Sequence, residues 1–249
     1  MKGVFLYCCL SFNSNWIRKI IELMVEYFPF IVSLIGLFFL LTNCIRYTKK
    51  LKFKGNVKYR LLAVYLVLLF VVEVFCNVMG FLKPGSNFFL SHYYFGFQFI
   101  CLSFFFYNVF TEVWIKKLIQ FVLIGVFIFL GVQYVLEPEL YWKFNVWEIG
   151  VTSILLIAYG LIYLFSNFDK PSHEYFYFCN GMIIYVASSC SIFLTGNQDS
   201  VILEKPFVLD FWFFNSLFYI LYQFFIYKEW CVLNSSEGGE EPGIVEKTV

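Results

Sequence analysis

The chain has little charge and few of the residues that build catalytic or metal sites. Charged residues make up 14% of its 249 residues, against about 25% in an average soluble protein. The net charge is +1, which argues against a nucleic-acid-binding domain because such domains carry a basic surface. Two histidines occur, and the eight cysteines show no C-x-x-C or Cys–His spacing. We therefore expect no metal site and no disulfide framework.

Catalytic motifs are missing as well. The chain has no G-x-S-x-G, H-E-x-x-H or phosphate-binding P-loop. Its last apolar stretch has no lysine before Lys228, so a retinal Schiff base has no candidate. Asp169, Asp199 and Asp210 lie at or outside the ends of apolar stretches, which leaves Glu73 as the one acid predicted deep inside a stretch. We expect neither an enzyme nor a bound cofactor.

Apolar side chains are what the chain has in abundance. Hydrophobic residues make up 61% of it, with 35 Phe and 18 Tyr, and the mean hydropathy is +0.75. A membrane-spanning helix needs about 20 mostly apolar residues, and seven stretches meet this need. The sequence predicts an integral membrane protein of all-α class, an antiparallel bundle of seven transmembrane helices at residues 27–46, 61–82, 88–110, 115–136, 146–166, 174–195 and 208–228.

The distribution of lysine and arginine predicts the orientation. Loops rich in these residues stay in the cytoplasm. Six basic residues fall on one side: Lys2, Arg18, Lys19, Lys83, Lys143 and Lys205. Twelve fall on the other: Arg46, Lys49, Lys50, Lys52, Lys54, Lys58, Arg60, Lys116, Lys117, Lys170, Lys228 and Lys247. We expect the N-terminus outside and the C-terminus in the cytoplasm, with the first basic loop attracted to anionic lipid headgroups.

Three parts are predicted along the chain. Residues 1–24 are either an amphipathic lead-in at the interface or a non-native start with Met24 as the true first residue. Residues 25–230 form the transmembrane domain. Residues 231–249 are acidic and glycine-containing, and predict a short disordered cytoplasmic tail.

Polar residues inside the predicted spans are the candidate site. Glu73 lies about 18 Å from the cytoplasmic end of its helix at about 1.5 Å per residue, and Asn77 is one turn further out on the same face. An intramembrane acid is commonly functional, yet a protonated glutamic acid can equally hold helices together by hydrogen bonds. Further polar residues fall at a similar or slightly more external depth. The predicted ligand-binding residues are Glu73, Asn77, His92, Gln98, Tyr185 and Asn215.

Three stretches resemble a known family. They are HYYFGFQFICLSFFFYNVF (92–110), FYFCNGMIIYVASSCSIFLTGN (176–197) and FWFFNSLFYILYQFFIYKEW (211–230). They look like the third, sixth and seventh helices of small uncharacterised bacterial seven-helix membrane proteins, some of whose relatives are the membrane input regions of sensor histidine kinases. Glu73, the Gly181-x-x-x-Tyr185 spacing and Trp212 fit this pattern. In the family, the position of Gln98 is often acidic and that of Asn215 often histidine, so both depart from it.

The function expected from these features is sensory. The protein would bind a small or lipidic ligand in the outer half of the bundle and signal to a separate partner, such as a histidine kinase, from a bacterial inner membrane. The alternative is a structural or assembly factor that binds another membrane protein through its helices. Besides such a protein, the expected partner is the lipid bilayer, and no nucleic acid is expected.

Overall fold

The structure is a computed structural model that describes residues 28, 30–51, 56–82, 88–168, 174–195 and 211–235. Within these residues every regular element is a helix, which confirms the all-α class. The helices are Phe30–Lys50, α2 (Val57–Leu82), α3 (Leu90–Val109), α4 (Val113–Leu136), the 3-10 helix η1 (Pro138–Trp142), α5 (Val146–Ser166), α6 (Phe176–Thr195) and α7 (Phe211–Ser235).

Each of the seven predicted stretches coincides with one long helix, although the ends differ. The first helix runs to Lys50 and α7 runs to Ser235, so the first five residues of the predicted tail are helical. The remainder of that tail and residues 1–24 lie outside the described part of the chain. The short η1 was not predicted; Pro138 begins it, at a position where the missing N–H breaks no helical hydrogen bond.

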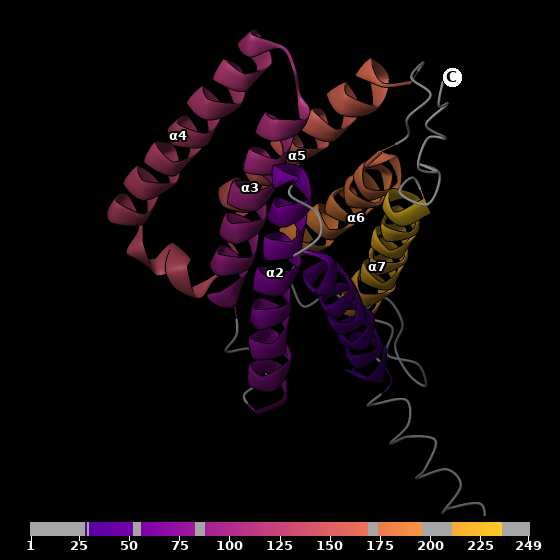
Figure 1. The fold of residues 1–249 in the computed structure, drawn as a ribbon. Helices are drawn as coiled ribbons and strands as arrows, with labels where there is room; N and C mark the ends of the chain where they lie inside the picture. The colour runs from indigo at the N-terminus through magenta and orange to yellow at the C-terminus, as the bar shows by residue number, and fades with distance from the viewer. Residues whose placement is uncertain are drawn as a thin grey trace, which may run out of the picture.

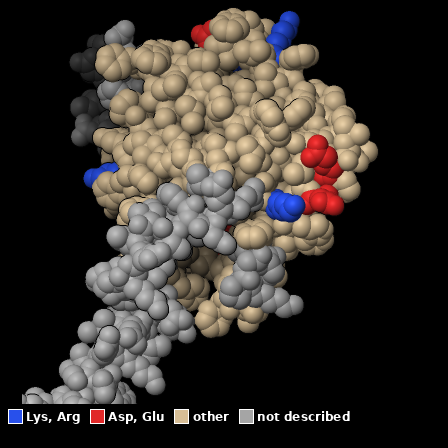
Figure 2. All heavy atoms as spheres, turned by 180° about the vertical axis from the view of Figure 1, so that it is seen from behind, with Lys and Arg blue, Asp and Glu red and all other residues tan. Residues whose placement is uncertain are grey.

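Five of these helices are long and apolar enough to cross a membrane: Phe30–Lys50, α2, α4, α5 and Phe176–Leu194 of α6. The protein is therefore an integral, multi-pass membrane protein. Figure 2 shows one broad face with few charged side chains, as contact with lipid requires. The two remaining helices, α3 and α7, carry more tyrosine and amide side chains. Half of the residues of α3 are buried, so protein surrounds much of this helix.

The helices form one packed body from which α4 stands apart (Figure 1). Helices α2 and α3 lie side by side, α3 contacts α5, and α5, α6 and α7 pack in succession. The helix Phe30–Lys50 joins α2 and α7. Its Asn43 amide donates to the Gln223 carbonyl oxygen at 2.9 Å, and its Tyr47 hydroxyl donates to the Ile226 carbonyl oxygen at 3.2 Å. By contrast, α4 buries a narrow stripe of four residues, Ile115, Ile119, Val126 and Leu130.

Helices α6 and α7 approach each other closely at Gly181. A Cβ atom added at this glycine would lie 2.5 Å from Phe225 Cβ, a separation that real Cβ atoms essentially never show. The absent side chain therefore sets the distance between the two helix backbones, as small residues do where membrane helices pack. This contact holds Tyr185, one turn further along α6, against α7.

Candidate functional site: a tyrosine cluster between four helices

Buried tyrosines from four helices meet in the middle of the bundle. Tyr65 of α2, Tyr94 of α3, Tyr185 of α6 and Tyr222 of α7 are each at most 6% exposed. The Tyr94 and Tyr185 hydroxyls are 2.7 Å apart, and the Tyr222 hydroxyl donates to that of Tyr65 at 3.3 Å. The Tyr185 and Tyr222 rings stack, with centroids 5.1 Å apart and planes 5° from parallel. Together with Gln98 and Tyr219, these residues are the tyrosine cluster.

Gln98 and Tyr219 are the two further members of the cluster, and the Tyr219 hydroxyl lacks a hydrogen-bond partner among the described residues. The Gln98 amide donates to the Tyr65 hydroxyl at 3.3 Å. The Tyr219 ring packs edge-on to Tyr185 at 5.4 Å, but its buried hydroxyl has no hydrogen-bond partner in the described chain. Asn215, one turn before Tyr219 on α7, lies near the Tyr185 hydroxyl, and its Oδ1 has no hydrogen-bond partner in the described chain. Buried polar atoms are usually satisfied, so two orphans in one place call for an explanation.

Glu73 lies beside the tyrosine cluster. Its carboxyl is near enough to interact electrostatically with the hydroxyls of Tyr65, Tyr94, Tyr185 and Tyr219. The residue is half-buried, and no hydrogen bond joins its carboxyl to another described side chain. A carboxyl, an amide oxygen and a phenol thus share one region with capacity to bind a further polar group.

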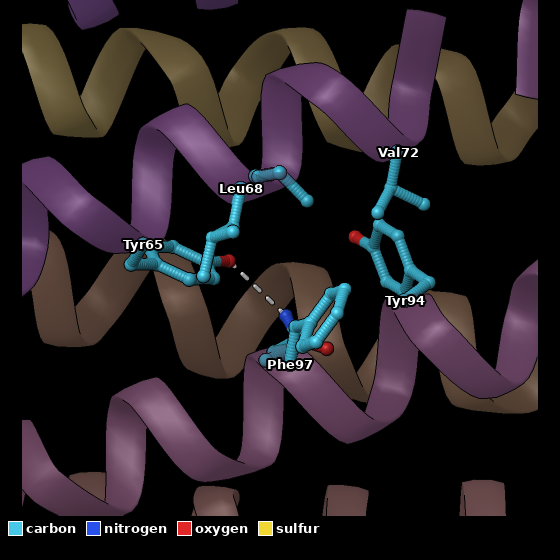
Figure 3. A pocket seen from close by; sticks show the side chains of 7 residues that line it. Tyr65, Leu68, Val72, Tyr94 and Phe97 are labelled. Atoms are coloured by element: carbon cyan, nitrogen blue, oxygen red, sulfur yellow. Dashed lines mark hydrogen bonds between the residues drawn. The ribbon is translucent and has the colours of Figure 1, made fainter. Parts of the chain in front are cut away.

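A small cavity opens next to the cluster, between α2 and α3 (Figure 3). Tyr65, Leu68 and Val72 reach into it from α2, and Tyr94 and Phe97 reach into it from α3. Leu69 and Gln98 complete its lining. Its volume is about 10 Å³, which is roughly the room that one water molecule requires. In this conformation the cavity holds a water-sized group and nothing as large as a lipid.

The six residues predicted as ligand contacts fall into three places. Glu73, Gln98, Tyr185 and Asn215 lie in or beside the tyrosine cluster. Asn77 instead ties helices together: its amide donates to the Glu73 carbonyl oxygen at 2.9 Å, and its Oδ1 accepts from the Ser33 hydroxyl at 2.8 Å. The sixth residue, His92, belongs to a separate group of polar side chains.

His92 sits among residues of α4, η1 and α5. Its Nε2 is 3.1 Å from the Tyr141 carbonyl oxygen, which only accepts, so Nε2 carries a hydrogen. Its Nδ1 is 2.6 Å from Glu148 Oε2, and the Tyr134 hydroxyl is 2.5 Å from that same oxygen. The Tyr134 hydroxyl is also 2.8 Å from His92 Nδ1, so His92, Glu148 and Tyr134 form one hydrogen-bonded group. This arrangement fastens the end of α4 to α3 and α5.

Tyr141 closes this group from the exposed η1 segment. Its ring stacks on His92 with centroids 5.6 Å apart, and its hydroxyl is 3.1 Å from that of Tyr93. The hydrogen bond to Tyr93 raises the pKa of the Tyr141 hydroxyl.

The sequence predicted Glu73 as the one acid deep inside the bundle, but the structure buries two further acids. Glu148 is 4% exposed and Glu229 is fully buried. Glu148 lies in the first turn of α5, which Asn145 caps by accepting from the Trp147 and Glu148 amides. The hydrogen-bond partners of both acids come from other helices. The one sequence signal for Glu148 was that His92 begins a helix at the same predicted end of the bundle.

Glu229 caps a helix to which it does not belong. Its Oε1 accepts from the Tyr175 amide at 2.5 Å and its Oε2 from the Phe178 amide at 3.1 Å. These amides are at the N-terminus of α6, where Tyr175 has a positive φ of 61°. The first amides of a helix have no partner within it, and the helix dipole favours a negative charge there. Glu229 on α7 thus satisfies the start of α6.

Comparison with known proteins gives no family for this chain. No family model, no curated protein and no solved structure matches it. The resemblance to sensor-kinase membrane regions therefore stays a prediction. Within the described residues no group of three or more His, Cys, Asp or Glu side chains is placed to hold a metal ion.

Proposed function

We propose that this integral membrane protein is a receptor-like component that recognises a small hydrogen-bonding ligand beside the tyrosine cluster. The observation that supports the proposal is that two buried polar atoms, Asn215 Oδ1 and the Tyr219 hydroxyl, have no hydrogen-bond partner among the described residues and lie near the half-buried Glu73 carboxyl. A ligand that carries several N–H or O–H donors, such as an amine or an amide, could hydrogen-bond to these groups. The cluster joins α2, α3, α6 and α7, so a ligand bound there could change the packing of four helices at once.

The proposal includes a seven-span, antiparallel topology with the cytoplasmic C-terminus expected from the basic residues. Signalling would then pass through the cytoplasmic ends of the helices to a separate protein, such as a histidine kinase. A phosphatase fused after Val249 should be inactive, and a fluorescent protein fused there should fluoresce. An active phosphatase would reverse the orientation and place the tyrosine cluster nearer the opposite surface.

Two substitutions of Glu73 distinguish a role in ligand recognition from a role in holding helices together. Glu73→Gln preserves the shape and much of the hydrogen-bonding capacity of the side chain, whereas Glu73→Ala removes both. In a receptor, Glu73→Gln should keep wild-type thermal stability in detergent. The change in transcript levels that distinguishes wild type from a deletion strain should fall at least about tenfold, because losing about 1.4 kcal/mol from a charge-assisted hydrogen bond weakens ligand binding tenfold. The measurements are melting in detergent and transcript levels in a strain lacking the native copy.

Two controls make the outcome decisive. Tyr219→Phe removes one of the orphaned groups and should weaken the same response with no loss of stability. Asn108→Ala removes an amide that bonds to its own helix, at the Phe104 carbonyl oxygen, and should leave the response unchanged. If Glu73→Gln matches wild type in both measurements while Glu73→Ala only melts earlier, the acid holds helices together and recognition at this place is wrong. The assembly alternative would then be favoured.

A further inference from the structure

A second polar feature lies at the end of the bundle opposite His92, where the helix Phe30–Lys50 ends and α7 ends beside it. The Arg46 guanidinium lies over the Tyr227 ring, 4.5 Å from its centroid, and 5.8 Å from the Trp230 ring. Lys50, one turn later on the same face, has its ammonium 5.7 Å from the Trp230 ring and bonds to Asn234. Two cations of one helix are thus held against two aromatic rings of another.

The aromatic rings hold the Arg46 guanidinium in place without neutralising its charge. A cation over an aromatic face gains about 0.5–1 kcal/mol at an exposed site, but the ring carries no net negative charge. Arg46 forms no ion pair with a carboxylate in the described part of the chain, and its hydrogen bond to Asn43 is long, at 3.5 Å from Nη1 to Oδ1. The nearest buried acid on α7, Glu229, has both oxygens committed to the N-terminus of α6. Arg46 therefore keeps most of its donor capacity.

The surroundings of Arg46 and Lys50 fit a membrane surface. Lys49 and Arg60 are exposed at this same end, where the first helix ends and α2 begins. Exposed apolar residues such as Ile45 lie alongside, and Trp230 and Tyr227 are the side chains typical of the boundary between lipid tails and headgroups. A planar guanidinium matches two oxygens of a phosphate, and an ammonium beside it adds a point charge.

We propose that Arg46 and Lys50, held by Tyr227 and Trp230, form a binding site for the phosphate of an anionic phospholipid headgroup. The site is independent of the tyrosine cluster and of any ligand bound there. It would retain one class of lipid at the junction of the first helix and α7. Because these two helices also pack against each other through Asn43 and Tyr47, the bound lipid would stabilise that contact.

The test compares lipid retention in nanodiscs of phosphatidylcholine, with and without phosphatidylglycerol, followed by native mass spectrometry of the released protein. Wild type should retain phosphatidylglycerol in preference to phosphatidylcholine. Arg46→Gln should lower that retention about fivefold, since one basic residue near an anionic surface contributes about that factor. Arg46→Lys keeps the charge but loses the planar guanidinium, so its retention of phosphatidylglycerol should lie between those of wild type and Arg46→Gln. This variant keeps the test valid if Arg46→Gln fails to fold.

The matched control is Arg60→Gln, which removes the same charge from the same end of the molecule but outside the site. It should retain phosphatidylglycerol as wild type does. Equal losses in Arg46→Gln and Arg60→Gln would assign the attraction to diffuse charge and overturn the site. Equal retention of the two lipids by wild type would overturn it as well. Displacement of the lipid by free inorganic phosphate would show that the site takes a soluble anion, which would overturn the assignment to lipid.

Discussion

Glu229→Ala is expected to lower the free energy of unfolding by about 2–4 kcal/mol. The carboxylate is fully buried and accepts from the Tyr175 and Phe178 amides at the start of α6. Its removal leaves both amides without an acceptor, at about 1–2 kcal/mol for each amide, which is in the range measured for the loss of a helix cap. Thermal unfolding in detergent, followed by loss of helical circular dichroism, measures the change.

The conservative variant sharpens this result. Glu229→Gln keeps one carbonyl oxygen to accept from a single amide, but it turns an N–H₂ group toward the other, so its stability should fall between wild type and Glu229→Ala. Glu137→Ala is the control, because Glu137 is an exposed acid whose side chain caps no helix. A melting temperature for Glu229→Ala equal to that of Glu137→Ala would mean that α6 does not depend on this carboxylate.

Gly181→Ala should be the other strongly destabilising change, at about 1–3 kcal/mol, the usual cost of overfilling a packed interior. The new methyl would meet Phe225 Cβ at 2.5 Å and Cγ at 2.9 Å. Because Cβ is fixed to the backbone, a change of rotamer cannot relieve this overlap, and α6 and α7 must separate. The same separation would pull the stacked Tyr185 and Tyr222 rings apart, so near-ultraviolet circular dichroism should change together with the melting temperature.

Gly125→Ala on α4 is the matched control for this substitution. No atom lies within 4 Å of the position that its Cβ would occupy, and alanine is the better helix former by about 1 kcal/mol. This variant should therefore be as stable as wild type or slightly more stable. Equal stability of the two glycine variants would contradict the close approach of α6 and α7.

The sequence predicted the helices well because a continuous apolar run in lipid has to satisfy its backbone hydrogen bonds within itself. It predicted the partners of polar residues poorly. Asn77 shares a face with Glu73, as its spacing implied, but its bonding partner Ser33 is 44 residues away on another helix. Glu148 and Glu229 were not among the predicted site residues, although both are buried against other helices. Packing between segments that are distant in the sequence decides which helix covers each of these acids. The spacing of residues along the sequence does not predict this packing.

Helices α3 and α7 are less apolar than the other long helices, and this affects how the chain enters a membrane. A segment crosses by itself when its residues gain enough from transfer into lipid to outweigh its polar groups. Helix α3, with Gln98, His92 and several tyrosines, is among the least apolar of the seven, and half of its residues face protein. Its polar groups find their partners on α2, α5 and α6. Stable insertion of α3 therefore depends on α2, which is synthesised before it, and on α5 and α6, which are synthesised after it. We expect these helices to insert into the membrane together and not one at a time.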